Sequence, residues 1–133
     1  MKKIIVLIVL VASFNVEAQK PKKNAKLKLE VDGVCFMCKK RIETAALKTK
    51  GVKFALWDVK SHILSLIIDE RKTNKKTIQK NIAAVGHDTK NVKATENAYN
   101  SVDPCCRYRD PKVVDDHKKE KQWKNMRYYL LCV

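Results

Sequence analysis

The sequence predicts an α+β protein, an open-faced sandwich in which two helices cover one face of a four-stranded antiparallel sheet. Three observations support this prediction. Hydrophobic residues alternate along several short segments, they recur at helical spacing in two others, and glycines separate the segments. In chain order the segments read β-α-β-β-α-β, which is the ferredoxin-like pattern. A basic C-terminal extension follows this module.

Four segments are predicted to be strands. Residues 27–31 alternate apolar and charged side chains, as expected of a half-buried strand. Val52, Phe54 and Leu56 alternate in the second strand, and residues 63–68 form the third. The turn between these two strands is short, which predicts a hairpin. The last predicted strand is short and spans about residues 91–94.

Two segments have helical spacing. The first predicted helix begins at Met37 and ends at Gly51, and the second is capped by Thr73 or Asn74 and ends at Gly86. Each helix has one apolar face, which indicates that this face packs on the sheet. The residues expected on these faces are Cys38, Ile42, Ala45, Ala46, Thr49, Ile78, Ile82 and Val85.

The N-terminus has the pattern of a secretory signal peptide. Residues 1–18 contain a basic start, an apolar stretch and small residues before an expected cut after Ala18. The apolar stretch is shorter than the roughly 20 residues that span a bilayer. We therefore expect a periplasmic or secreted protein that begins at Gln19, has a flexible leader over 19–24, and has no stable membrane insertion after cleavage.

The chain is strongly basic, with a formal net charge of +15 at pH 7. Such a charge can indicate nucleic-acid binding. The lysines are scattered through every segment, however, and an exported protein rarely meets nucleic acid. The charge instead favours an acidic-faced partner protein or an anionic surface.

A Cys-x-x-Cys motif stands at the start of the first predicted helix. Cys35 and Cys38 are three positions apart, so their sulfurs can point at the same spot, and the N-terminal amides of the helix stabilise thiolate over thiol. Two thiolates suit Cu(I), whereas zinc takes four ligands. The same pair also suits thiol–disulfide exchange, or a buried or disulfide-bonded pair without a ligand.

Three separate stretches of the sequence resemble the heavy-metal-associated (HMA) domain family, which includes copper chaperones and the periplasmic mercury-binding protein. The stretches are residues 30–47, Gly51-Val52 and Gly86-His87-Asp88. The resemblance covers residues 27–94 and implies a metal-binding domain over 25–94. It implies Cys35 and Cys38 as ligands of Cu(I), with Hg(II), Zn(II) and Cd(II) as alternatives.

The metal-binding loop departs from the family in length and composition. It is one residue shorter than usual and lacks the methionine that anchors the loop in the core, so Phe36 or Met37 is expected to turn inward instead. The Met37 thioether is also a possible weak ligand. The resemblance places His87 beside the loop, where it is either a third ligand, a pH-dependent neighbour or a surface histidine.

The extension, residues 95–133, is expected to be partly helical and holds the other three cysteines. Cys105 and Cys106 are adjacent and cannot easily bind one ion with both sulfurs, so we expect one further thiolate near the main site or a disulfide elsewhere. Cys132 is expected to be free or to pair between chains, so that a dimer is linked through it or through a metal. Five cysteines leave at least one thiol outside any intramolecular disulfide.

These features predict an exported, non-enzymatic protein that holds Cu(I) between Cys35 and Cys38 for transfer or sequestration. A thiol–disulfide oxidoreductase that uses the same pair is an alternative, although the tryptophan and proline of the thioredoxin motif are absent. A further alternative is a non-metallated interaction domain whose basic tail meets an anionic surface. No pattern for hydrolysis or phosphoryl transfer is present.

Overall fold

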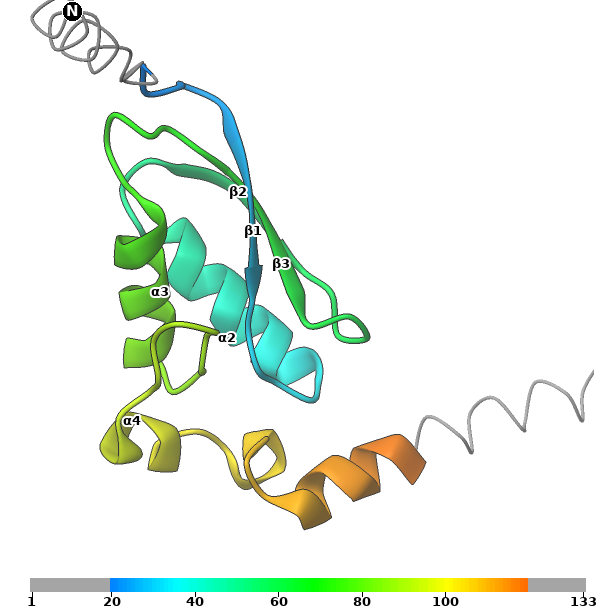
Figure 1. Cartoon of the computed structure of the whole chain (residues 1–133). Helices are drawn as coiled ribbons and strands as arrows, with labels where there is room; N and C mark the ends of the chain where they lie inside the picture. Colours follow the sequence, from blue (N-terminus) through cyan, green and yellow to red (C-terminus); the bar gives the residue numbers. More distant parts are fainter. Residues whose placement is uncertain (1–19, 120–133) are drawn as a thin grey trace, which may run out of the picture.

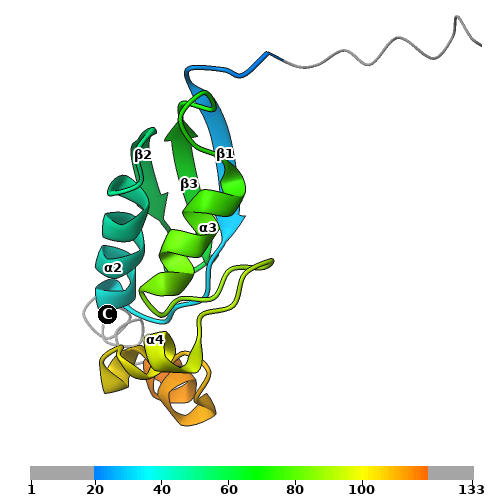
Figure 2. The ribbon, with the colours of Figure 1, turned by 90° about the vertical axis from the view of Figure 1, so that its left-hand side faces the viewer.

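The computed structural model describes residues 20–119 and has the predicted α+β architecture. Three antiparallel strands form a sheet in the order β1-β3-β2, and the two longer labelled helices lie together on one face of it (Figure 1 and Figure 2). The elements in chain order are β1 (Ala25–Glu30), α2 (Phe36–Leu47), β2 (Val52–Trp57), β3 (Ile63–Ile68), α3 (Lys75–Ala84), α4 (Glu96–Asn100) and the 3₁₀ turn η2 (Pro104–Cys106).

The core lies between the sheet and the two helices. On β1 and β3, Leu27 pairs with Leu66 and Leu29 pairs with Leu64, so the apolar residues of both strands share the face toward the helices. Trp57, at the end of β2, is fully buried, and its indole N–H donates to the carbonyl of Val31 (3.1 Å). The alternation predicted for the first and third strands is confirmed.

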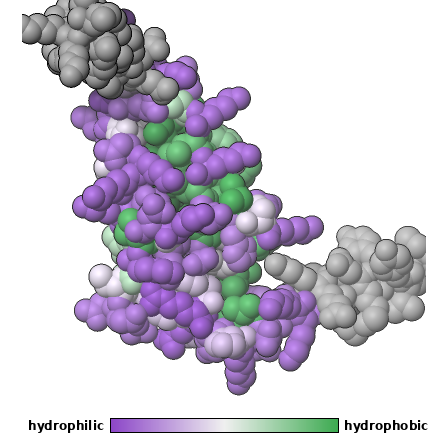
Figure 3. All heavy atoms as spheres, viewed as in Figure 1, coloured by the Kyte–Doolittle hydropathy of each residue, from purple (hydrophilic) through white to green (hydrophobic). Residues whose placement is uncertain are grey.

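The second strand is confirmed, but its apolar alternation does not mark its buried face. A register shift between Val52 and Phe54 changes which residues point inward, so Ala55 and Trp57 face the core. Phe54 and Leu56 are instead 44 % and 49 % exposed. Figure 3 shows hydrophobic side chains at the surface over the sheet, framed by hydrophilic ones.

The predicted buried faces of the helices are confirmed. In α2 the buried residues are Cys38, Ile42, Ala45 and Ala46. In α3 the residues Ile78 and Ile82 are fully buried, whereas Val85 is only partly so. Asn74 caps α3, because its side chain accepts a hydrogen bond from the Thr77 backbone N–H (3.0 Å).

The fourth strand expected at residues 91–94 is absent from the described residues. A single antiparallel bridge, between Val31 and Thr89, stands in its place. The Thr89 backbone N–H donates to the carbonyl of Val92 (2.9 Å), which turns the chain away from β1. The Asp88 carboxylate then accepts a hydrogen bond from the Ala94 backbone N–H (2.7 Å) and closes this turn, so the backbone does not continue along the sheet.

The described part of the C-terminal extension packs against the sandwich. We call residues 95–119 the C-terminal segment. It contains α4, η2 and a helix over residues 111–119, and it lies beneath the end of the sandwich where α2 begins (Figure 1 and Figure 2). Val102 and Cys106 of this segment belong to the same core cluster as the sheet and helix residues. The segment is therefore packed into the module that it follows.

Gly86 allows this packing. Its φ of +91° is unfavourable for other residues, and an added Cβ would lie 2.5 Å from the carbonyl oxygen of Ala98 and 2.6 Å from Val102 Cγ1. The chain after α3 can therefore lie directly against α4 only because residue 86 has no side chain.

Some predictions fall outside residues 20–119. These are the signal peptide over 1–18, Cys132, and the part of the predicted C-terminal helix beyond residue 119. Within the described range, none of the helices has the length and apolar character that a membrane crossing requires.

Candidate metal centre

Three cysteine thiols meet at the start of α2. The sulfur of Cys35 lies 3.5 Å from that of Cys38 and 3.6 Å from that of Cys106, and all three sulfurs lie within 4.8 Å of one another. Two of them come from the Cys-x-x-Cys loop and the third from the C-terminal segment. The four cysteines in the described residues are free thiols, so none of them is in a disulfide.

The backbone at the start of α2 brings the first two thiols together. Cys35 is the N-cap residue and has an extended conformation, with φ −143° and ψ 177°. Cys38 is one turn further on, with its side chain fully buried. The first turn of α2 contains no acidic side chain, so the Cys35 sulfur is the group best placed to interact with the positive end of the helix.

The loop before the helix rests on Trp57. A Cβ added at Gly33 would lie 3.0 Å from Cys38 Cβ and 3.0 Å from Trp57 Cη2, which is tighter than an ordinary van der Waals contact and would require these neighbours to shift. Val34, the next residue, is buried in the core cluster. A small residue at position 33 and an apolar one at position 34 therefore fix the loop on the core without the usual methionine.

Burial and hydrogen bonding affect the three thiols differently. Burial raises the pKa of Cys35. Hydrogen bonds from the backbone and thiol of Cys38, the thiol of Cys106 and the backbone of Met37 together outweigh burial, so the pKa of Cys35 lies below its ordinary value. Burial raises the pKa of Cys38. Burial, together with the neighbouring Cys38, raises the pKa of Cys106 well above its ordinary value. Hydrogen bonding at the helix start therefore lowers the pKa of Cys35 overall, whereas at Cys38 burial outweighs the hydrogen bonds that lower its pKa.

The exposed edge of the site carries two more sulfur atoms. Cys105 is exposed, and its thiol lies 3.7 Å from the Met37 thioether sulfur. Phe36 is 78 % exposed and Met37 is 49 % exposed, so the expectation that one of them turns inward is wrong. The reason is that Trp57 and Val34 already fill the core beneath the loop.

His87 is buried but does not join the thiol cluster. Its Nδ1 lies 2.9 Å from the carbonyl oxygen of Asp32, and its ring stacks on Tyr108 with the centroids 5.6 Å apart. Its Nε2 is buried without a hydrogen-bond partner. Burial lowers the pKa of His87, so the ring is neutral at pH 7. Among residues 20–119, the one group of at least three ligand atoms within metal-binding reach contains the three cysteines and not His87. The alternative of a surface histidine is wrong.

The basic residues after the motif are engaged in ion pairs. The Lys39 ammonium donates to Glu43 and to the carbonyl of Trp57 (2.7 Å). Arg41 donates to Asp103 (2.8 Å). Because Asp103 lies immediately before η2, the pair with Arg41 joins α2 to the turn that carries Cys106.

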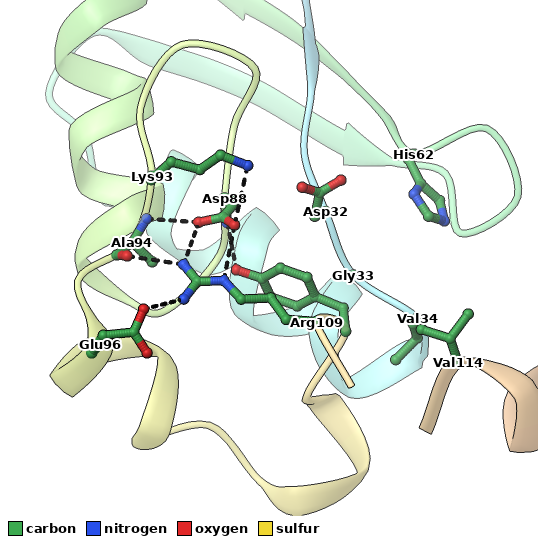
Figure 4. A pocket seen from close by; sticks show the side chains of 11 residues that line it. Asp32, Gly33, Val34, His62, Asp88, Lys93, Ala94, Glu96, Arg109 and Val114 are labelled. Atoms are coloured by element: carbon green, nitrogen blue, oxygen red, sulfur yellow. Dashed lines mark hydrogen bonds and ion pairs between the residues drawn. The ribbon is translucent and has the colours of Figure 1, made fainter. Parts of the chain in front are cut away.

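A second set of contacts holds the C-terminal segment to the loop after α3. The Arg109 guanidinium donates two hydrogen bonds to Asp88 (2.8 and 3.1 Å), and it also donates to the carbonyl of Ala94 (2.9 Å) and to Glu96 (2.7 Å). Figure 4 shows these contacts beside a hollow of about 600 Å³, with Asp32 and His62 across from them. None of the three clustered cysteines lines this hollow.

The arrangement suits a soft cation, because thiolate sulfur is the preferred ligand of soft metal ions. The sequence left open whether Cys105 or Cys106 adds a thiolate near the site or forms a disulfide elsewhere. A signal for the choice is present in the spacing: Tyr99, Val102 and Cys106 recur at helical intervals of three and four, and all three are buried. Cys105 is outside this pattern and is exposed.

Comparisons with known proteins found similar structures. No family model matches the chain, and none of the curated proteins matches it. The CopZ metallochaperone is 26 % identical to the chain, with a TM-score of 0.48, and the match covers 49 % of this chain and 98 % of that one. The putative copper-ion-binding protein from Bacillus anthracis str. Ames is 25 % identical, with a TM-score of 0.48 and coverage of 50 % and 96 %. Oxidized MerP from Ralstonia metallidurans CH34 is 22 % identical, with a TM-score of 0.48 and coverage of 50 % and 93 %. These matches each cover about half of this chain.

Proposed function

We propose that this protein is an exported, non-enzymatic carrier of a soft metal ion. Its cargo is Cu(I), held between Cys35 and Cys38 for transfer to an acidic-faced partner protein or for sequestration. The observation that carries the proposal is the meeting of free thiols at the N-terminus of α2, with the sulfurs of Cys35 and Cys38 3.5 Å apart.

The chemistry of the donor set supports a soft ion. Thiolates favour Cu(I) and other thiophilic ions over hard ions such as Mg²⁺, which prefer oxygen ligands. The lowered pKa of Cys35 favours the thiolate form of this side chain over an ordinary cysteine thiol. Cys38, whose pKa is raised, gives up its proton when the cation binds.

The position of the site supports transfer. Cys35 is partly exposed, and the loop lies at the end of the sandwich and not within the core. An incoming thiolate from a partner can therefore add to the ion before one of the original ligands leaves. The basic surface favours an approach by an acidic-faced partner.

The proposal is tested by anaerobic titration of the purified protein with Cu(I) against a chelator of known affinity. We expect one tightly bound Cu(I) per chain. Cys35→Ser and Cys38→Ser should each lower the affinity by at least the roughly 10–100-fold that loss of an outer-shell partner costs. Cys105→Ser is a matched control, because this exposed thiol lies outside the cluster, and it should bind as the unmodified protein does.

Unchanged Cu(I) affinity in both variants of the motif would overturn the proposal. An oxidoreductase remains the second candidate, because the pKa of Cys35 is lowered and that of Cys38 is raised, as in a pair with one attacking and one resolving thiol. Catalytic turnover in insulin reduction, lost in Cys35→Ser, would favour that candidate over a metal carrier.

A further inference from the structure

We propose that Cys106 is a third metal ligand, and that the three thiols form a three-coordinate site for a divalent soft cation such as Cd(II) or Hg(II). The bound ion would tie the C-terminal segment to the metal-binding loop. This inference rests on the proposed function, because it uses the same two sulfurs of the Cys-x-x-Cys motif.

The spacing of the sulfurs fits three-fold coordination better than a linear pair. With a metal–sulfur bond of about 2.3 Å, three ligands in a plane around an ion lie about 4.0 Å apart, and two ligands in a line lie about 4.6 Å apart. The sulfur of Cys35 is 3.5 Å from Cys38 and 3.6 Å from Cys106, and the whole set spans no more than 4.8 Å. A three-coordinate ion therefore requires smaller movements than a linear one.

The charge of the loaded site favours a divalent ion for this geometry. Cu(I) with two thiolates and a divalent cation with three thiolates both leave a net charge of −1, whereas Cu(I) with three thiolates leaves −2. Excess charge is costly here because Cys38 and Cys106 are fully buried. Two basic side chains of α2, Lys39 and Arg41, are already paired with Glu43 and Asp103. Each thiol that binds releases its proton to solvent.

Cys106 is held in place by contacts that do not involve a metal. Its backbone N–H donates to the carbonyl of Asp103 (2.8 Å), and the Asp103 carboxylate accepts from Arg41 of α2 (2.8 Å). Arg41 lies three residues after Cys38 on the same helix. The ion pair therefore fixes the third sulfur relative to the first two before any ion arrives, which lowers the entropic cost of binding.

Cys105 provides a matched control for Cys106. The two residues are adjacent and chemically identical, but Cys105 is exposed and its sulfur contacts Met37 at 3.7 Å and not the cluster. A difference between Cys105→Ser and Cys106→Ser would therefore report the position of the sulfur and not the number of cysteines in the chain.

The test is anaerobic titration of the full chain with Cd(II), followed by the thiolate-to-cadmium absorption in the ultraviolet and by ¹¹³Cd NMR. We expect a three-thiolate spectrum for the unmodified protein and for Cys105→Ser. Cys106→Ser should show about one third less of this absorption. Its Cd(II) affinity should fall at least tenfold, because loss of even an outer-shell partner lowers metal affinity about 10–100-fold. Its Cu(I) affinity should change less than its Cd(II) affinity.

A second readout follows the C-terminal segment directly. Cd(II) should slow tryptic cleavage after Arg107 and Arg109 in the unmodified protein and in Cys105→Ser, but not in Cys106→Ser. Cys106→Ala is measured in parallel, because a serine hydroxyl at this buried position costs more than an alanine methyl group. The NMR spectrum of the unmodified protein counts its thiolate ligands without any substitution.

A two-thiolate ¹¹³Cd shift in the unmodified protein, or unchanged Cd(II) affinity in both Cys106 variants, would overturn this inference and leave the proposed function standing. Unchanged affinity for both ions in Cys35→Ser and Cys38→Ser would instead overturn the proposed function. The two failures are therefore distinguishable.

Discussion

The absence of a side chain at Gly33 lets the loop that carries Cys35 lie directly on Trp57. An added Cβ would meet Cys38 Cβ and the Trp57 ring at 3.0 Å, and neither neighbour can move freely, since both Cys38 and Trp57 are fully buried. The position of the Cys38 sulfur therefore depends on a residue that does not itself bind metal.

Gly33→Ala is expected to strain the loop and to shift Cys38. Overpacking of this kind costs about 1–3 kcal/mol in the free energy of unfolding, and the shifted Cys38 sulfur should also weaken metal binding. Urea unfolding and the Cu(I) competition titration measure the two effects. Unchanged stability together with unchanged affinity would show that the loop is not held by this contact.

At the scale of elements, the pairing of Asp88 with Arg109 joins two segments that are distant in sequence. Asp88 follows α3 and has a side chain only 4 % exposed, and Arg109 follows η2. Arg109 also stacks on Tyr99 of α4, with its guanidinium carbon 4.3 Å from the ring centroid. The Tyr108 hydroxyl accepts from the Asp88 backbone N–H (2.8 Å) and donates to the carbonyl of Gly86 (3.0 Å). These contacts hold the turn that carries Cys106 against the sandwich.

The Asp88 carboxylate should make stability depend on pH. Burial raises the pKa of Asp88, but the hydrogen bonds from Arg109 and from the Ala94 backbone outweigh burial, so the pKa lies below its usual value. Its stabilising contribution is therefore complete above the unfolded pKa of about 3.9 and is lost as the pH falls through the lower folded pKa. Asp88→Asn should cost about 1.5–3 kcal/mol near neutral pH, and this difference should shrink below about pH 4.

Urea unfolding of the unmodified protein and of Asp88→Asn between pH 7 and roughly pH 2.5 measures this difference. Asp115→Asn serves as the control, because the pair that Asp115 forms with Lys118 is exposed, and it should change little at any pH. A difference for Asp88→Asn that stays constant down to the lowest pH would contradict the assigned role of the carboxylate.

At the scale of the whole molecule, the C-terminal segment completes the module. Val102 and Cys106 belong to the main core cluster, so the end of the sandwich that carries the thiol cluster is closed by residues beyond the predicted domain of 25–94. The face of the sheet that points away from the helices carries the exposed side chains of Phe54 and Leu56.

Export of the whole chain is predicted from residues 1–18 and gives a separate test. Expressed with its full sequence in a bacterial host, the protein should be recovered from the periplasm or the medium, and its intact mass should correspond to a chain that begins at Gln19. Replacement of Ile4 and Leu7 by charged residues should keep it in the cytoplasm, because a signal peptide requires its apolar stretch. Periplasmic protein that retains Met1 would contradict cleavage.

Much of the fold could be predicted because local patterns dominate it. The alternation in β1 and β3 and the helical spacing in α2 and α3 each follow from one buried face per element. The prediction was wrong where a neighbouring segment decided the outcome. The register shift before Phe54 exchanged the two faces of β2, and the turn closed by Asp88 replaced the fourth strand.

The sequence by itself determined the sandwich and the Cys-x-x-Cys pair at a helix start, because both depend on residues that are close along the chain. The spacing of Tyr99, Val102 and Cys106 marks Cys106 as the buried cysteine, but only the tertiary structure brings its sulfur to this pair and keeps His87 out of the cluster. The physical reason is that the position of the third sulfur depends on contacts between distant segments, namely Arg41 with Asp103 and Arg109 with Asp88. No periodicity within one segment encodes these contacts.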